Sequence, residues 1–384
     1  MHVAVVGAGI IGLSTAWHLR RLGASVTLID PTPAKGASHA AAGMLAPAAE
    51  VVWGQTPLYP LMRSSAALYP EFAAEVADAS QCELGHSTAE TLVCAGDRAD
   101  LQTLQELVKL QHEAGFDTAL ITGSQARDLE PSLSPGISGA VRIPRDHSID
   151  PRRLCAALMQ LFAEDLEQQS VSALLRSGDR THGVRLADGR PLTADQVIIT
   201  AGAECNEISG APRLPLRRVW GEVIRLRPPA PLAPLLTRTI RGLVRGRAVY
   251  VVPRPDGELV LGASSREDGR SGTNAGGIHQ MLHDGERLVP GLLECDITDI
   301  TTRARPGSPD DVPIIGRIDP GCVVSTGYFR HGVLLAPLGG QLTAELAQGI
   351  SSEWLPPEAI ESVSPRRFIP TPEPADPDSV RSPS

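Results

Sequence analysis

Residues 2–30 read HVAVVGAGIIGLSTAWHLRRLGASVTLID. An apolar run of strand length leads into the glycine turn Gly7-Ala-Gly-Ile-Ile-Gly12, an apolar pattern of helical period follows, and a second strand ends at Asp30. Strand, glycine turn, helix, strand and acid occur in the order of a dinucleotide-binding βαβ unit, which is the context that the GxGxxG motif requires. The stretch therefore predicts that this segment binds an ADP-containing cofactor.

Each residue of the motif has a physical role. Gly7 permits the tight turn from strand to helix, Gly9 lets the backbone approach a pyrophosphate, and Gly12 lets the helix pack closely on the strand. The helix N-terminus offers unpaired N–H groups and the positive end of its dipole to the phosphates. Asp30 can accept hydrogen bonds from both ribose hydroxyls, and its charge repels a 2′-phosphate, which leaves FAD or NAD. The alternative is a structural βαβ unit without a ligand.

The length and composition predict a globular protein of two domains. With 384 residues, the chain exceeds the usual size of one hydrophobic core. It is 42% hydrophobic, and no apolar stretch approaches the roughly 20 residues that span a bilayer. Because the first strand follows Met1 almost at once, there is no room for a signal peptide, and we expect a cytoplasmic protein without a membrane partner.

Charge and cysteine usage exclude other classes of protein. The formal net charge is −9, and the arginines are scattered among acids without forming a basic stripe, so we expect no nucleic-acid partner. The six cysteines include no CxxC pair, and no histidines cluster at the spacing of metal ligands. We therefore predict no metal site, and we expect the cysteines to be buried or free thiols in a reducing compartment.

Beyond the first unit, helical and strand patterns alternate. Residues 101–114, 151–166 and 335–350 predict helices, the second of them capped by Asp150. Strand patterns dominate the middle of the chain and predict an antiparallel sheet from residues 217–226, 248–253 and 258–262. Proline and serine crowd the C-terminal end, so residues 356–384 are expected to form a flexible tail.

Five stretches together are far more specific than the glycine motif alone. In residues and order they resemble the FAD-dependent amine oxidases of the D-amino acid oxidase, sarcosine oxidase and glycine oxidase group, most closely the glycine oxidases of thiamine biosynthesis, over nearly the whole chain up to about residue 350. The stretches are Gly7–Gly12 with Asp30, Ser38-His-Ala-Ala-Ala-Gly-Met-Leu45, Thr200-Ala-Gly202, Tyr250-Val-Val-Pro-Arg254, and Arg305-Pro-Gly307 followed by Gly327-Tyr-Phe-Arg-His-Gly-Val-Leu-Leu-Ala-Pro337.

The resemblance implies an α/β fold. A glutathione-reductase-like Rossmann FAD domain, assembled from discontinuous segments, would carry a smaller α+β substrate domain with an antiparallel sheet. We expect the FAD domain to comprise residues 1–85, 145–215 and 303–355, and the substrate domain to comprise residues 86–144 and 216–302. A homo-oligomer is also expected.

The resemblance makes non-covalent FAD the expected cofactor. Small residues at positions 40–43 would let the backbone lie against the flat isoalloxazine ring, and the helix that opens at Gly332 would stabilise negative charge on the flavin N1–C2=O edge. The covalent flavin cysteine of the sarcosine oxidases has no counterpart near Arg305, because Cys322 lies well downstream. The residues expected to contact FAD are Gly7, Gly9, Ile10, Ile11, Gly12, Asp30, Ser38, His39, Ala41, Ala42, Gly43, Met44, Val171, Thr200, Ala201, Gly202, Arg330, His331, Gly332, Val333, Leu334 and Leu335.

Three residues are expected at the substrate. Arg305 lies in the Arg-Pro-Gly context of the family's carboxylate-binding arginine, and a guanidinium matches a carboxylate with two parallel hydrogen bonds. Tyr250 resembles the family's active-site tyrosine, whose hydroxyl would bind the same carboxylate. Arg330 matches a position whose backbone carbonyl could receive the substrate amine.

The chain also departs from the family pattern. Thr301-Thr-Arg303 stands where an aromatic residue and a glycine are usual, and Ala203-Glu204 stands where tryptophan is frequent. These departures affect the shape of the substrate pocket and leave the flavin-binding elements unchanged.

The resemblance implies the oxidation of glycine, with sarcosine and small D-amino acids as alternatives. Hydride would leave Cα of the neutral amine for flavin N5, the imine would hydrolyse to glyoxylate and ammonia, and O2 would become H2O2. No general base is required, so none is assigned to His39, His147 or His331. The product would supply dehydroglycine for thiazole formation, with thiazole synthase as the functional partner.

Two other functions remain open. A D-amino acid dehydrogenase would pass electrons to an acceptor other than O2, and nothing in the sequence separates the two cleanly. A flavin-binding protein without turnover is disfavoured, because such a protein has no need of a carboxylate clamp such as Tyr250 with Arg305.

Overall fold

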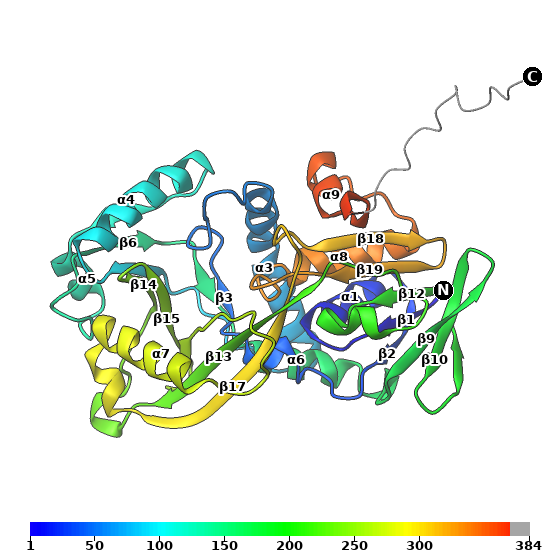
Figure 1. Ribbon diagram of the computed structural model, residues 1–384, viewed down its shortest axis with the longest axis horizontal. Coiled ribbons are helices and arrows are strands. Elements are labelled where there is room, and N and C mark those ends of the chain that lie inside the picture. Colours follow the sequence, from blue (N-terminus) through cyan, green and yellow to red (C-terminus); the bar gives the residue numbers. More distant parts are fainter. Residues whose placement is uncertain (369–384) are drawn as a thin grey trace, which may run out of the picture.

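The computed structural model describes residues 1–368 and has two halves, each built on its own sheet (Figure 1). In one half, six strands pair in the order β18-β19-β12-β1-β2-β8, and all neighbours are parallel except β18 and β19. The strands are β1 (His2–Val6), β2 (Ser25–Ile29), β8 (Leu166–Glu167), β12 (Gln196–Ile199), β18 (Ile314–Asp319) and β19 (Cys322–Thr326). The predicted strand-turn-helix-strand unit thus lies at the centre of a mostly parallel sheet.

The central strand β1 is buried on both faces because the sheet lies between two other layers. Val3 and Val5 join a core with the helices, whereas Ala4 and Val6 pack on the other side against a three-stranded antiparallel meander. The helices are α1 (Ile10–Arg21), α3 (Leu58–Ser80), α6 (Pro151–Leu161) and α8 (Ala336–Gln348), and the meander is β9 (Val171–Ser177), β10 (Arg180–Leu186) and β11 (Pro191–Thr193).

The predicted helices are present with adjusted ends. Asp150 caps α6 as expected, because its carboxylate accepts hydrogen bonds from the N–H groups of Arg152 at 2.9 Å and Arg153 at 3.3 Å. The helix ends at Leu161, five residues before the predicted end at 166, because the chain turns through a short 3₁₀ segment into the edge strand β8. The predicted helix at 101–114 is α4 (Arg98–Glu113).

The other half contains an eight-stranded sheet in the order β17-β13-β16-β15-β14-β4-β6-β5 (Figure 1). The predicted antiparallel sheet is confirmed, with one parallel pair, β14 and β4. Its strands are β4 (Thr91–Ala95), β5 (Ala119–Ile121), β6 (Gly139–Ile143), β13 (Arg217–Arg227), β14 (Thr239–Val244), β15 (Arg247–Pro253), β16 (Leu259–Gly262) and β17 (Asp296–Gly307), and α4, α5 (Gly123–Leu129) and α7 (Ala275–Leu288) accompany them.

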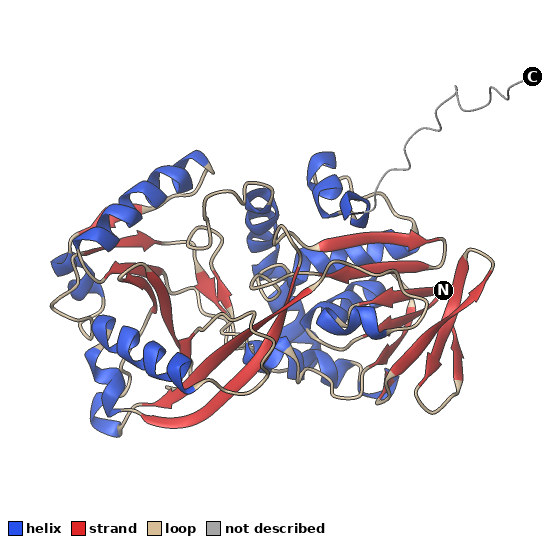
Figure 2. Cartoon of the chain, viewed as in Figure 1, coloured by secondary structure: helices blue, strands red, loops and turns tan. Residues whose placement is uncertain are grey.

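The long strands β13 and β17 extend from the eight-stranded sheet toward the parallel sheet (Figure 2). They pair continuously from Arg227–Asp296 to Arg217–Gly307, with one irregularity near Arg225. The domain boundary expected at residue 303 therefore falls inside β17. With this strand shared between the halves, the two-domain division remains our proposal.

The expectation of a flexible tail from residue 356 is wrong for residues 357–368. These residues form α9 (Pro357–Val363) and a 3₁₀ turn (Pro365–Phe368). Ala359 and Val363 are one helical turn apart and are buried in the helical core, and Pro365 packs against Gly316. The proline-rich composition hid this short apolar stripe. The rest of the expected tail, 369–384, lies outside the described residues.

Candidate cofactor and substrate site

The three motif glycines differ in what requires them. A Cβ on Gly7, where φ is +106°, would lie 2.6 Å from the Thr200 carbonyl oxygen, and one on Gly12 would lie 2.7 Å from Thr200 Oγ1, so the fold itself excludes side chains there. At Gly9 the backbone is extended, and the only atom near an added Cβ is Ser38 Oγ at 3.3 Å. Contacts with the protein require glycine at positions 7 and 12, but no contact within residues 1–368 requires it at position 9. Gly9 therefore fits the close approach of a ligand.

The start of α1 retains free hydrogen-bond donors. Ile10 N–H donates to Ser38 Oγ at 2.9 Å, whereas the N–H groups of Gly9, Ile11 and Gly12 make no hydrogen bond within residues 1–368. Asp30 lies beside them and accepts from the N–H of Ala8 at 2.7 Å through Oδ2. Its other oxygen accepts from Thr32 N–H at 2.8 Å, and each carboxylate oxygen keeps a further acceptor site. The end of the turn can therefore receive an anion and a diol together.

The segment of small residues lies between the two halves. It runs from α2 (Ala37–Ala40) through Ala41, Ala42 and Gly43 to β3 (Met44–Leu45), which pairs with β7 (His147–Ser148). His39, within α2, is partly exposed, and burial together with Arg152 lowers its pKa to about 4. Gly43 has φ of +75°, and a Cβ there would lie 2.7 Å from Pro151 Cδ. The backbone of this segment is thus packed too tightly for larger side chains.

Arg254 fixes this segment to the eight-stranded sheet, a role that the sequence did not reveal. Its Nη2 donates to the carbonyl of Ala42 at 2.6 Å and its Nη1 to the carbonyl of Ile149 at 2.9 Å. The side chain is almost fully buried, and burial lowers its pKa to about 10, so it remains a cation at neutral pH. The Tyr250–Arg254 motif thus contributes an anchoring residue at its end.

Two more groups of residues that the sequence assigned to FAD are residues 200–202 and Val171. Thr200 follows β12, and its hydroxyl donates to the carbonyls of Val6 at 3.0 Å and Gly7 at 2.8 Å, which ties Ala201 and Gly202 to the glycine turn. Val171 lies at the start of β9, paired with Leu186.

The segment after β19 reaches α8 by a turn. The regular helix α8 begins at Ala336, one residue after the start predicted from the apolar pattern and four residues after the opening at Gly332 that the resemblance implies. The first helical hydrogen bond, from Leu335 N–H to the His331 carbonyl at 2.8 Å, already encloses Gly332. Among the described residues, the N–H groups of Gly332, Val333 and Leu334 donate to no protein atom. These donors form a second group of free N–H groups at a helix start.

The sheet register places Tyr250 and Arg305 on one face of the eight-stranded sheet. Tyr250 pairs with Gly262, Gly262 pairs with Val223, and Val223 pairs with Thr301, so these residues share a face. Arg305 follows Thr301 by four positions and lies on the same face because side chains alternate along a strand. Two residues 55 positions apart in the sequence thus point the same way.

Glycines make room for both side chains, which the sequence did not indicate. A Cβ on Gly262 would lie 2.7 Å from Tyr250 Cε2, and a Cβ on Gly221 would lie 2.6 Å from Arg305 Cζ. Both side chains therefore lie flat against the sheet at its glycine positions.

The polar atoms of these two residues are mostly uncommitted. Of the guanidinium donors of Arg305, only Nη1 is used, in a hydrogen bond to the Ser264 carbonyl at 3.2 Å, and no carboxylate of residues 1–368 lies within 4 Å. Burial lowers the pKa of Arg305 and raises that of Tyr250. An arginine nonetheless keeps its charge in proteins, and the raised pKa favours the neutral phenol of Tyr250. Within the described chain the Tyr250 hydroxyl also makes no hydrogen bond. The pair can bind an anion.

Arg330 lies beside Arg305 because Phe329 N–H donates to the Pro306 carbonyl at 2.7 Å. The Arg330 side chain turns to Glu50, with Nε 2.8 Å from Oε2, and Arg241 pairs with the same carboxylate. Burial alone would raise the pKa of Glu50, but the two arginines hold it well below its usual range. The Arg330 carbonyl accepts no hydrogen bond from residues 1–368.

His331 and Glu50 are two further titratable residues near Arg330. His331 is 1% exposed, its Nε2 lacks a protein partner, and burial lowers its pKa to about 4, so it is neutral at physiological pH. Glu50 belongs to no motif, and only its long-range contacts with Arg241 on β14 reveal that it lies here.

The sequence departures have structural partners elsewhere. Thr301 Oγ1 accepts from Arg152 Nη2 at 3.3 Å, Thr302 shares a 2.8 Å hydrogen bond with Thr273, and Arg303 Nε donates to the Lys35 carbonyl at 2.7 Å. Glu204 is exposed and lies 3.6 Å from Arg218. The departures thus fasten β17 to its neighbours on both sides.

Comparison with known proteins decides the family. A family model described as FAD dependent oxidoreductase (DAO) matches residues 2–346. The chain belongs to this family of FAD-dependent oxidoreductases. A bifunctional ThiO/ThiG protein of Nostoc sp. is 30% identical over 90% of this chain, which spans about half (52%) of that relative's length. The glycine oxidase of Geobacillus kaustophilus is 29% identical over 90% of this chain and 92% of the relative.

Solved structures agree with the family. The crystal structure of glycine oxidase from Geobacillus kaustophilus superposes with a TM-score of 0.83 at 28% identity, covering 91% of this chain and 95% of that one. Iminodiacetate oxidase from Chelativorans sp. has a TM-score of 0.83 at 29% identity, over 94% of this chain and 98% of the other. The expected α/β fold of this family is therefore confirmed.

The residues present fit FAD, the cofactor of the family. Gly9 leaves space where no protein atom needs it, free N–H groups surround both helix starts, and the buried His331 Nε2 has no protein partner. These features lie on two of the segments that the sequence assigned to FAD, residues 7–12 and 330–335. None of the helices formed by residues 1–368 is long and apolar enough to cross a bilayer.

Proposed function

We propose that the protein is an FAD-dependent oxidase of small amino acids, with glycine as its main substrate. The observation that carries the proposal is the pair formed by Arg305 and Tyr250, which share one sheet face. Among residues 1–368 both keep free donors, and no carboxylate lies within 4 Å of the Arg305 guanidinium. A guanidinium fork binds a carboxylate through two charge-assisted hydrogen bonds, and the phenol adds a third donor.

The other residues would orient the amine. The Arg330 carbonyl has its acceptor sites free and could receive an amine N–H, while the Arg330 side chain is held away from the substrate by Glu50. His331 is neutral, and no histidine needs to act as a base, because the neutral amine releases hydride directly. Catalysis then depends on position and electrostatics.

FAD would supply the electron acceptor: when bound, it takes the hydride from Cα and returns the electrons to O2, giving H2O2. We propose that Gly7–Gly12 with Asp30 hold its ADP portion, that residues 200–202 line its middle, and that residues 38–44 and 330–335 hold the ring. Val171 is proposed to contact the same cofactor. Non-covalent binding is supported by the Cys322 thiol, which is buried within β19.

The imine product would hydrolyse to glyoxylate and ammonia or supply dehydroglycine for thiazole formation. The relatives named ThiO/ThiG support a role in thiamine biosynthesis, with thiazole synthase as the functional partner. An oxygen electrode with glycine, sarcosine and D-alanine tests the acceptor. Turnover with a dye acceptor but without O2 consumption would instead indicate a dehydrogenase, and no turnover with any amino acid would indicate a flavin-binding protein.

Substitution of Arg305 tests the substrate class. Arg305→Lys keeps the charge but loses the fork, so the KM for glycine should rise about ten- to hundredfold, and Arg305→Ala should raise it further. Methylamine has no carboxylate, so its KM should rise much less. Arg218→Lys, an exposed arginine on β13, is the matched control. An equal rise in the KM for glycine and for methylamine, with FAD content unchanged, would contradict the proposal.

A further inference from the structure

Glu222 is a fully buried carboxylate on β13, next to the glycine on which Arg305 lies. Its Oε1 accepts from Arg266 Nη2 at 2.5 Å and Nε at 3.1 Å, and from Asn274 N–H at 3.3 Å. Its Oε2 bonds to Ser264 Oγ. A buried charge with this many partners is stable only while the partners stay in place.

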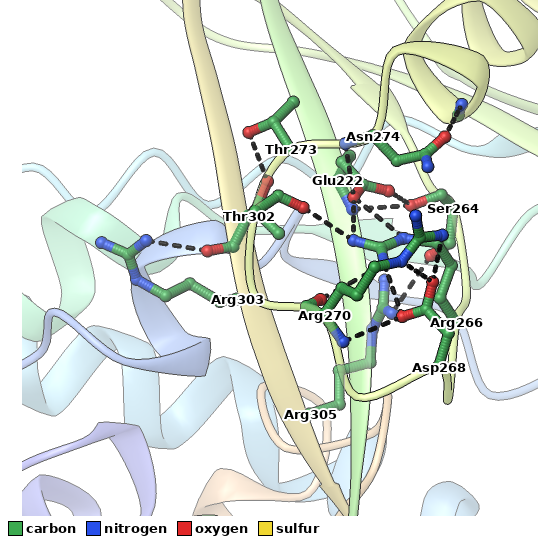
Figure 3. A network of polar contacts seen from close by, with 12 residues as sticks. Glu222, Ser264, Arg266, Asp268, Arg270, Thr273, Asn274, Thr302, Arg303 and Arg305 are labelled. Carbon is green, nitrogen blue, oxygen red and sulfur yellow. Dashed lines mark hydrogen bonds and ion pairs between the residues drawn. The ribbon is translucent and has the colours of Figure 1, made fainter.

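The same contacts organise the loop 263–274, which joins β16 to α7. Arg266 donates to the carbonyls of Arg270 at 3.2 Å and Gly272 at 2.9 Å, and to Asp268 at 2.7 Å, while it keeps its ion pair with Glu222. The Thr273 hydroxyl bonds to Thr302 of β17 at 2.8 Å. The loop is therefore wrapped around the Arg266 side chain and attached to both long strands (Figure 3).

Ser264 connects this network to Arg305. Its Oγ accepts from Glu222 N–H at 2.7 Å and its N–H donates to the Glu222 carbonyl at 3.4 Å, so three contacts, including the Oγ–Oε2 bond, fix Ser264 to one residue. The remaining polar group of its backbone, the carbonyl, accepts the 3.2 Å hydrogen bond from Arg305 Nη1. Among residues 1–368 this is the single hydrogen bond made by the Arg305 guanidinium.

Side chains alternate along β13, so Glu222 points to the face opposite Gly221 and Arg305. Glu222 therefore cannot neutralise the Arg305 fork by a direct ion pair, and none within 4 Å is present. Its hydrogen-bonded route to Arg305 runs through Ser264, and its charge acts on Arg305 across space as well. This arrangement leaves the positive charge of Arg305 available while its orientation is fixed.

We propose that Glu222 is a positioning residue: with Arg266 it fixes the Ser264 carbonyl, and this carbonyl holds the Arg305 guanidinium in the orientation that binds the substrate carboxylate. The proposal rests on the proposed function of Arg305. A freely rotating arginine must lose side-chain entropy when it binds, whereas a guanidinium already held at one nitrogen loses less. The loop 263–274 thus determines affinity for the carboxylate.

The test uses the FAD-loaded protein with Glu222→Gln and Ser264→Ala. The first change keeps the shape of the Glu222 side chain but loses the charge that holds Arg266, and the second removes both Oγ bonds while the backbone carbonyl stays. We expect the Kd for acetate, followed by the flavin absorbance change, and the KM for glycine to rise about tenfold or more. The kcat at saturating glycine, the KM for methylamine and the FAD content should change by less than about twofold.

Arg270→Met is the matched control, because the exposed Arg270 pairs with Asp268 in the same loop and its side chain makes no hydrogen bond with Glu222 or Ser264. The positioning role is overturned if both test variants bind acetate with the Kd of the unmodified protein, or if the KM for glycine and the KM for methylamine rise equally. In either case the proposed function of Arg305 stands. If the unmodified protein neither binds acetate nor oxidises glycine, the proposed function falls and the positioning role falls with it. Ser264→Ala decides the matter if Glu222→Gln fails to fold.

Discussion

The guanidinium of Arg305 lies over Gly221 so closely that a methyl group on Gly221 would come 2.6 Å from Cζ. The two residues are diagonal neighbours across the β13–β17 pair, because Gly221 pairs with Arg303. The absence of a side chain at Gly221 thus gives Arg305 its place, although the two positions are 84 residues apart in the chain. If Arg305 binds the substrate as we propose, their relationship makes that site sensitive to a single methyl group outside every recognised motif.

Gly221→Ala should therefore displace Arg305 without harming the fold. The backbone at Gly221 has no positive φ, so alanine fits the strand, but its Cβ must push the guanidinium aside. We expect the KM for glycine to rise about tenfold or more while FAD content is kept. Steady-state kinetics check this, with Gly272→Ala as the control, since an added Cβ there meets nothing within 4 Å. An unchanged KM would show that Arg305 does not bind the substrate.

Gly9→Val should give a folded protein that retains little FAD. Position 9 has extended backbone and one neighbouring atom at 3.3 Å, so the protein tolerates a side chain but the approaching pyrophosphate does not. Gly12→Ala should instead lower the yield of folded protein, because its Cβ would lie 2.7 Å from Thr200 Oγ1. Circular dichroism and the flavin absorbance of the purified proteins distinguish the two effects. Normal FAD occupancy in Gly9→Val would refute the placement of the pyrophosphate.

Arg254→Met should weaken FAD binding. The change removes the hydrogen bonds to the Ala42 and Ile149 carbonyls, each worth about 1.5–3 kcal/mol as a charge-assisted bond, and frees the segment of small residues. We expect the Kd for FAD, measured by flavin fluorescence with the apoprotein, to rise about tenfold or more. Arg227→Met, at a partly exposed position on β13, should leave the Kd unchanged. The same rise in both variants would show that Arg254 has no special role.

His18 makes the stability of the fold depend on pH. Burial, assisted by Arg21, lowers the pKa of His18 from 6.5 to about 4, and the ring stacks on Phe72. Between these values the unfolded chain binds a proton that the folded chain rejects, so stability is highest above pH 6.5 and falls as the pH decreases toward 4. In His18→Phe the thermal midpoint should fall less over this range than in the unmodified protein. A fall of equal size would mean that His18 is not responsible.

The sequence by itself determined the nucleotide-binding unit, and it named the residues that we propose to carry the chemistry. The unit could be read because each of its requirements is local: the tight turn at Gly7, the helix start after it and the acid at Asp30 follow one another along the chain. The strands of the second sheet were also recognisable from local patterns of apolar residues. The tail was misjudged where a short apolar stripe, Ala359 and Val363, was hidden among prolines.

Only the tertiary structure decided how Arg305 is held and what surrounds it. Gly221, Glu222, Ser264 and Arg254 carry no local pattern, because their roles arise from strand register and from contacts between residues far apart in the chain. Glu50 likewise becomes recognisable only when Arg241 and Arg330 are brought to it from two other elements. A sequence specifies short-range geometry residue by residue, whereas the orientation of a buried charge depends on every partner that the fold assembles around it.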